Sequence, residues 1–149
     1  MATFPKTLGE LKKSGYQSKS IKEELRANLI ANLKEGKSSF EGIHGYDTTV
    51  IPQLERAILS EHNINLLGLR GQAKTRLAHL MVGLLDEYIP FVEGSEVNDD
   101  PLKPLSRFAI EQLDVHGDDT PIAWLHRDDR FYEKLATPDV TISDLIGDI

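Results

Sequence analysis

Residues 64–75 combine an apolar run with residue types that bind phosphate. The run Ile64-Asn65-Leu66-Leu67 leads into Gly68-Leu69-Arg70-Gly71-Gln72-Ala73-Lys74-Thr75. This fits the phosphate-loop pattern G-x-x-x-x-G-K-[ST], except that Ala73 stands where the second glycine is usual. The segment therefore predicts a short strand that runs into a nucleotide-binding loop.

Each residue type in this loop has a physical role in holding phosphate. Gly68 lets the chain turn sharply, and Gly71 lets the backbone approach a phosphate closely. The backbone N–H groups of the loop can point inward at the positive end of the following helix. Lys74 would place a charge on the β- and γ-phosphates, and the Thr75 hydroxyl would reach Mg²⁺. The candidate nucleotide-contacting residues are Gly68, Arg70, Gly71, Gln72, Ala73, Lys74 and Thr75.

The chain after the loop predicts the helix that the pattern requires. Apolar residues recur at helical spacing, at Leu77, Leu80, Met81, Leu84, Leu85 and Tyr88. We expect this helix to end near Ile89-Pro90. Since Ala73 lies next to the helix start, we expect it to adopt helical dihedral angles, with a Cβ that reduces the room for the β-phosphate. The alternative is a glycine-rich turn whose Lys74 is merely solvated.

Two further helices are predicted before the loop, after an irregular arm over residues 1–17. Ser20–Glu23 reads as a capping box, and apolar residues follow at Ile21, Leu25, Leu29, Ile30 and Leu33. Gly36 suits the end of this helix. A second helix over residues 50–58 carries Pro52 in its first turn. Its predicted cap is Asp47, Thr48 or Thr49.

The segments after the loop helix give shorter predictions. Phe91-Val92 and Pro121–Leu125 are predicted strands, and Ser106–Leu113 is a predicted short helix. We expect Trp124 to lie in the core. Residues 140–149 alternate apolar and polar side chains.

A nucleoside triphosphatase also needs a carboxylate at the end of a neighbouring strand to hold Mg²⁺. The nearest pair is Asp128-Asp129, which two residues separate from the apolar run ending at Leu125. This offset moves the carboxylates roughly 7 Å along an extended chain, which favours a turn over a metal site. Asp99-Asp100 and Asp118-Asp119 lack a preceding strand. Arg127 and Arg130 flank this pair. They either stabilise a transition state or lie in a solvated loop.

Composition bounds the class of protein. The chain has 149 residues, enough for one domain with a sizeable core, and no cysteine, which excludes disulfides and thiolate metal sites. Its net charge is −7, from eight Lys/Arg and four Asp/Glu over residues 1–40 and nine and twenty over residues 41–149. The acidic body argues against nucleic acid as a partner. No apolar run is long enough to span a bilayer and no signal peptide is recognisable, so we expect a cytoplasmic protein without a membrane partner.

The segments from about Thr7 to Ile149 resemble the start of an AAA+ ATPase of the magnesium chelatase I-subunit and MoxR branch. That branch commonly writes its loop G-x-x-G-x-A-K-T, which residues 68–75 fit, Ala73 included. Phe40–Tyr46 resembles the family segment that lies against adenine, and the matching positions are Ile43, His44 and Tyr46. Three further segments resemble later landmarks of the family, namely Phe91–Gly94, Asp100-Pro101 and Asp144–Asp148.

The resemblance implies an α/β fold, namely a partial P-loop (AAA+) nucleotide-binding domain with an N-terminal helical segment and an incomplete parallel sheet. Residues 1–36 would form an arm and a helix, and residues 37–149 the N-terminal part of the ATPase domain. The implied cofactors are ATP or ADP and Mg²⁺, with Thr75 near the metal, and the implied assembly is a homo-oligomeric ring of the full-length protein. The family's Asp-Glu motif, sensor residues and arginine finger would follow Ile149, so no catalytic residue is assigned.

The expected function is therefore ATP binding, with hydrolysis by the full-length protein that remodels an unidentified protein partner or drives metal insertion. One alternative is a nucleotide-dependent interaction module without hydrolysis, because the chain lacks a convincing catalytic carboxylate. Another is a small self-contained P-loop NTPase, which would require Asp128 to lie close to Thr75.

Overall fold

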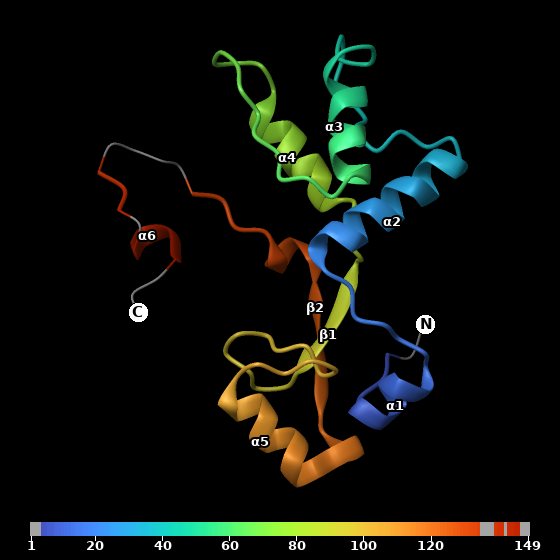
Figure 1. The fold of residues 1–149 in the computed structure, drawn as a ribbon, viewed down its shortest axis with the longest axis vertical. Coiled ribbons are helices and arrows are strands. Elements are labelled where there is room, and N and C mark those ends of the chain that lie inside the picture. Colours follow the sequence, from blue (N-terminus) through green and yellow to red (C-terminus); the bar gives the residue numbers. More distant parts are fainter. Residues whose placement is uncertain (1–3, 135–138, 142, 147–149) are drawn as a thin grey trace.

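Apart from the short helix at Ser143–Ile146, the α-helices lie in two groups at the two ends of a two-stranded ribbon (Figure 1). The computed structural model describes residues 4–134, 139–141 and 143–146. Helices α2, α3 and α4 lie at one end of the ribbon, and α1 and α5 at the other. The elements are α1 (Leu8–Lys13), α2 (Ile21–Lys34), α3 (Val50–Leu59), α4 (Lys74–Val82), β1 (Tyr88–Val92), α5 (Arg107–His116), η1 (Gly117–Asp119), β2 (Ile122–His126), η2 (Arg127–Arg130) and α6 (Ser143–Ile146).

The fold is mixed α/β, but its sheet is antiparallel and not parallel as expected. Strands β1 and β2 pair with Tyr88 opposite His126 and Val92 opposite Ile122. The long connection between them brings the chain back to the end of the ribbon at which β1 finishes, so the two strands run in opposite directions. Predicted strands at Phe91-Val92 and Pro121–Leu125 are therefore confirmed in substance, although β1 begins three residues earlier.

The predicted strand at Ile64–Leu67 does not form. Within the described residues, no backbone hydrogen bond joins residues 63–67 to another segment, and a strand is defined by such bonds. The alternation of a strand is nevertheless present, because Ile64 and Leu66 pack against the main core while Leu67 is 87% exposed. The sequence pattern thus sets which side chains face the core, but no neighbouring strand is placed beside them.

The main core joins α2, α3 and α4. Its buried residues are Leu29, Phe40, Ile43, Leu54, Ile58, Leu77 and Leu84. The helices contribute Leu29, Leu54, Ile58 and Leu77 at positions that the periodicity predicted, and Phe40 and Ile43 come from the link between α2 and α3. The predicted positions Ile21 and Leu33 of α2 are instead 57% and 46% exposed. Burial of these side chains, worth about 1.5–3 kcal/mol each, fixes the base of α4 against its neighbours.

The arm expected over residues 1–17 is ordered into α1 at its centre. The Thr7 hydroxyl caps this helix by accepting from the Glu10 N–H at 3.3 Å. Leu8 and Leu11 are buried against Ile122 of β2, and the Leu8 N–H donates to the Thr120 carbonyl at 3.0 Å. Two apolar residues give too short a pattern for a helix prediction, and their partner lies more than a hundred residues away.

The Trp124 region covers one face of the ribbon. Trp124 is partly buried beside the second core, and its Nε1–H donates to the Pro5 carbonyl at 2.8 Å. The Phe4 ring lies 4.7 Å from Trp124 and 5.2 Å from Tyr88 between centroids. These contacts hold the N-terminal segment on the ribbon.

Helix boundaries follow local chemistry where a cap is present. The capping box at Ser20 and Glu23 is formed, and Gly36 ends α2 with φ of 67°. Ser106 caps α5, whose observed range extends the prediction to His116. In contrast, Thr49 precedes α3 without a side-chain cap bond.

Helix α4 ends at Val82, earlier than predicted. Leu84 and Leu85 continue as tight turns and are buried, and Tyr88–Pro90 enters β1. Leu84 and Leu85 therefore fit the helical spacing of apolar residues in the sequence, but they pack into the core from a turn. Among the described residues, no helix is long and apolar enough to cross a membrane.

Candidate functional site

The predicted phosphate loop leads directly into α4. Gly71 has φ of 79° and Ala73 has φ of 53° and ψ of 19°, so both lie in the left-handed region. The expectation that Ala73 adopts helical dihedral angles is therefore wrong. The loop reverses direction immediately before Lys74, and this reversal is what the glycine of the usual pattern accommodates.

The backbone donors from Arg70 onward are the next feature of this loop. Within the described chain, the N–H groups of residues 70–76 have no acceptor. The N–H groups at the start of α4 lack intrahelical partners because of their position, and they carry the positive end of the helix dipole. A series of unpaired N–H groups at a helix start fits an anion such as a phosphate group.

Lys74 is held within its own loop. Its Nζ donates to the Gly68 carbonyl at 2.9 Å and to the Leu69 carbonyl at 2.5 Å. The Gln72 carboxamide Oε1 accepts from the Leu69 N–H at 2.8 Å. A Cβ at position 68 would meet the Gln72 carboxamide, so a larger residue there would displace this side chain from the Leu69 N–H. The ammonium group is thus bonded to carbonyl groups at the start of the loop.

The remaining loop positions are exposed. Arg70 and Thr75 both face solvent, and Thr75 lies in the first turn of α4 directly after Lys74. A hydroxyl there fits the Mg²⁺ that accompanies a bound nucleotide, although no metal-binding side chain is grouped with it. In the part of the chain that the structure describes, no cluster of three or more His, Asp or Glu could hold a metal ion.

The segment predicted to lie against adenine is only partly beside the loop. The Tyr46 hydroxyl donates to the Gln72 carbonyl at 3.3 Å, which brings this residue to the loop. Ile43 is 7% exposed and belongs to the main core, and His44 faces solvent. The Arg76 guanidinium lies so close to Gly42 that a Cβ there would clash at 2.5 Å. Arg76 was not predicted, although it directly follows the loop motif.

A hollow of about 300 Å³ adjoins the loop. Its polar lining consists of Tyr46, Gln53, Asn65, Gln72 and Lys74, and leucine and valine side chains complete the wall. Gln53 and Asn65 also line a second hollow of about 210 Å³ next to it. Neither residue was predicted as part of the site, because an exposed carboxamide on a helix or before a loop has no distinctive spacing.

The candidate metal carboxylates lie elsewhere. Asp128 belongs to the η2 turn, which supports the interpretation as a turn. The adjacent Arg127 donates to the Gly83 and Leu85 carbonyls at 3.0 and 3.2 Å, just beyond the end of α4. Thr75 lies at the start of α4, about 12 Å away along the helix axis. Asp128 therefore cannot share a metal ion with Thr75 in this arrangement.

The other predicted carboxylates have structural roles. Asp99 accepts from the Ser95 and Ser106 hydroxyls, and Asp100 accepts from the Ser18 hydroxyl. Asp118 pairs with Lys12 at 2.6 Å. Of the family landmark at residues 144–148, Asp144 lies in α6, and Gly147 and Asp148 lie outside the described residues.

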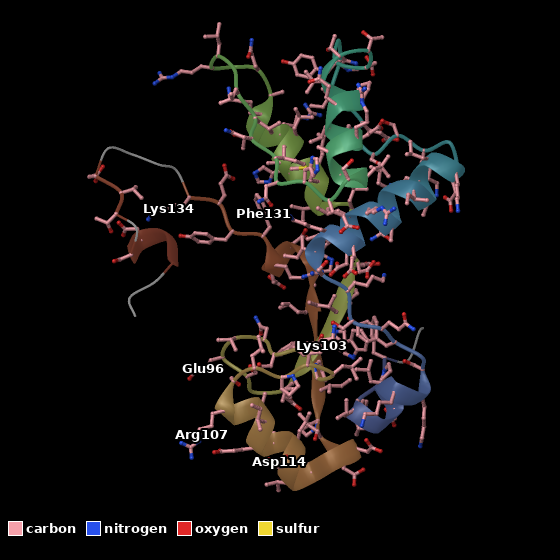
Figure 2. All side chains as sticks on the ribbon, in the orientation of Figure 1. Glu96, Lys103, Arg107, Asp114, Phe131 and Lys134 are labelled. Atoms are coloured by element: carbon pink, nitrogen blue, oxygen red, sulfur yellow. The ribbon has the colours of Figure 1, made fainter. Side chains whose placement is uncertain are left out.

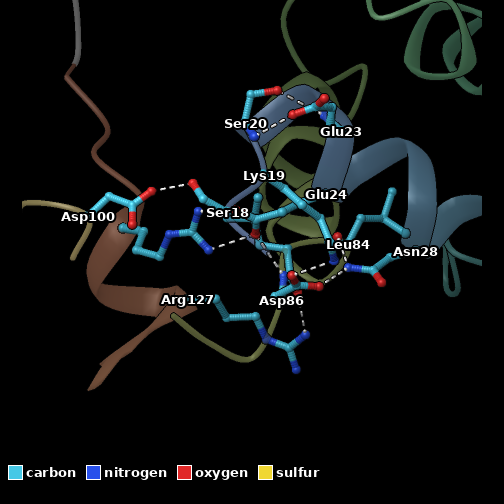
Figure 3. A network of polar contacts seen from close by, with 12 residues as sticks. Ser18, Lys19, Ser20, Glu23, Glu24, Asn28, Leu84, Asp86, Asp100 and Arg127 are labelled. Carbon is cyan, nitrogen blue, oxygen red and sulfur yellow. Dashed lines mark hydrogen bonds and ion pairs between the residues drawn. The ribbon is translucent and has the colours of Figure 1, made fainter. Parts of the chain in front are cut away.

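A polar network anchors the far end of α4 (Figure 3). Arg130 forms a bidentate pair with Glu24 of α2, at 2.7 and 2.8 Å, and the Asp86 N–H donates to the same carboxylate at 3.0 Å. The Glu24 and Arg130 side chains are only 3% and 9% exposed. Arg130 is therefore a buried structural residue, and the expectation of a solvated loop is wrong for it.

Burial and charge shift two pKa values in this network. Burial raises the pKa of Asp86, but hydrogen bonds from Asn28 and Lys19 lower it more, so the net pKa lies below its usual range. Burial and the nearby charges of Asp100, Glu24 and Asp86 raise the pKa of Tyr16 to about 12. Both shifts are explained by packing, and neither group lies at the phosphate loop.

Comparison with known proteins identifies no relative. No protein-family model matches the chain, and no curated protein and no solved structure is similar to it. The geometry of the loop is therefore the basis on which a function is proposed.

Proposed function

We propose that this chain binds ATP or ADP with Mg²⁺ at Gly68–Thr75, as part of an ATPase similar to the chelatase and MoxR branch of the AAA+ proteins. The observation that carries the proposal is the set of N–H groups at residues 70–76, which have no acceptor within the described chain and belong to the same loop and helix start as Lys74. In this proposal these donors and Lys74 hold the phosphates, and Thr75 holds the metal.

The lysine charge provides the direct test. Lys74→Ala should abolish binding of a fluorescent ATP analogue, measured by anisotropy, because it removes the only charged side chain that lines the hollow among the described residues. Lys22→Ala, an exposed lysine of α2, is the matched control and should bind normally. Circular dichroism should show that both variants are folded. Equal affinity in the two variants would contradict the proposal.

A second candidate is nucleotide binding without hydrolysis by this chain. The position of Asp128 at the opposite end of α4 from Thr75 favours it, because the described residues place no strand-end carboxylate at the loop. Binding of the analogue without release of phosphate would support this candidate. Steady turnover that Lys74→Ala abolishes would instead support a complete ATPase site. We also propose that the site works in a ring that remodels a partner or drives metal insertion.

A further inference from the structure

The hollow beside the phosphate loop has the chemistry of a base-binding site. Gln53 comes from α3 and Asn65 from the segment before the loop, so two separate elements place carboxamides on one wall. Neither carboxamide has a hydrogen-bond partner within the described chain. Both are exposed, so their donors and acceptors are available to a ligand.

The rest of the lining restricts what the hollow can hold. Lys74 is its only charged group among the described residues, and it also belongs to the phosphate loop. Leu66 and Leu77 supply apolar contact area, and the Tyr46 hydroxyl is fixed on the Gln72 carbonyl. A neutral planar ring attached to an anion fits this combination of apolar walls, carboxamides and a single cation.

We infer that the hollow receives the adenine ring of the nucleotide and that Gln53 and Asn65 select it over guanine. This inference rests on the proposed function, since Lys74 and the loop must hold the phosphates. A carboxamide offers an acceptor and a donor side by side, which match the N6 amino group and N7 of adenine. Guanine presents the O6 and N7 acceptors at the same edge, so the carboxamide oxygen that accepts from the adenine amino group would face a second acceptor.

Three ligands separate the roles of the loop and the hollow. Inorganic tripolyphosphate tests the loop alone, while ATP and GTP share their phosphates and differ in the base. Competition against a fluorescent ATP analogue should show that the unaltered chain binds ATP roughly tenfold or more tightly than GTP. The variant carrying Gln53→Ala and Asn65→Ala should lose this preference and keep its affinity for tripolyphosphate.

Asn63→Ala is the matched control, because Asn63 is an exposed carboxamide of the same segment that does not line this hollow. It should keep the preference for ATP. The inference would be overturned if the double variant kept the preference for ATP, or if the unaltered chain had no such preference. In either case, binding of tripolyphosphate would still support the phosphate loop. If the unaltered chain binds none of the three ligands, the proposed function is overturned as well.

Discussion

At the scale of the residue, Ala73 shows what the loop demands of the backbone. Its φ of 53° is unfavourable for any residue with a Cβ, and the cost is about 1–2 kcal/mol. The conformation persists because the turn must end between Gly71 and the first residue of α4. Alanine at this position therefore adopts, with backbone strain, a conformation that glycine adopts without it.

Ala73→Gly should raise the free energy of unfolding by up to about 1 kcal/mol. Glycine removes the left-handed strain, and its greater freedom in the unfolded chain offsets part of the gain, by about 0.4–1 kcal/mol. Ala78→Gly is the matched control within α4, and it should lower the free energy of unfolding by about 1 kcal/mol. Urea unfolding measures both changes. If Ala73→Gly lowered the free energy of unfolding as much as the control does, this result would contradict the observed dihedral angles.

At the scale of the element, Asp99 organises the loop that joins β1 to α5. Its carboxylate is buried and accepts from the Leu105 and Ser106 N–H groups at 2.7 and 2.9 Å and from two serine hydroxyls. Since Ser106 is also the cap of α5, Asp99 fixes where that helix begins. Charged side chains such as Arg107 and Asp114 then lie on the outer side of α5 (Figure 2).

Asp99→Asn should lower the free energy of unfolding at pH 7 by about 2 kcal/mol, since it removes charged hydrogen bonds. Burial raises the pKa of Asp99, but the hydrogen bonds from Ser106, Ser95 and Leu105 lower it more, so the net pKa lies well below its usual range. The stabilisation is complete above about pH 4, where the unfolded carboxyl is ionised, and falls as the pH drops toward the folded pKa.

Urea unfolding of both chains between pH 7 and pH 2 measures this dependence. The difference between the original chain and the Asp99 variant should shrink steadily below about pH 4. Asp114→Asn, which alters an exposed carboxylate of α5, is the control and should change stability by less than about 0.5 kcal/mol. A difference that stays constant with pH would show that the carboxylate charge is not what stabilises the loop.

At the scale of the whole molecule, the Glu24–Arg130 pair joins segments from opposite ends of the described chain. It links α2 to the η2 turn after the ribbon, and Asp86 joins the pair from the turn after α4. The helices that support the phosphate loop are thereby fixed to the ribbon (Figure 1). Because both charges are buried away from water, each one is compensated mainly by its interaction with the other.

Arg130→Met should lower the free energy of unfolding by about 3–5 kcal/mol, because it leaves Glu24 buried without its partner. Adding Glu24→Met should restore much of this loss, since the unpaired charge is then removed. Arg107→Met is the control, because the Arg107–Glu111 pair is exposed and worth at most about 0.5 kcal/mol. Thermal and urea unfolding measure all four chains. A loss no greater than that of the control would show that the pair does not hold the helices to the ribbon.

Local features of this protein were predictable from the sequence, and distant contacts were not. The capping box at Ser20 and the Ser106 cap of α5 depend on neighbours within a few residues. Short apolar runs predicted the two ribbon strands, but which strand each would pair with was not predicted. The order of Gly68, Lys74 and Thr75 likewise predicted a loop before a helix. The buried Arg130 was missed because its partner Glu24 lies 106 residues away, and no local spacing reports such a contact.

The phosphate-loop motif and the helix that follows it were thus determined by the sequence alone, because glycine positions and helical periodicity act over a few residues. Tertiary structure decided that the sheet is antiparallel, that α1 packs on the ribbon and that Ile64–Leu67 has no strand beside it. It also decided that Gln53 and Asn65 share one hollow with Lys74. These outcomes depend on which distant segments come into contact. Such contacts are set by the lowest free energy of the whole chain and not by that of any one segment.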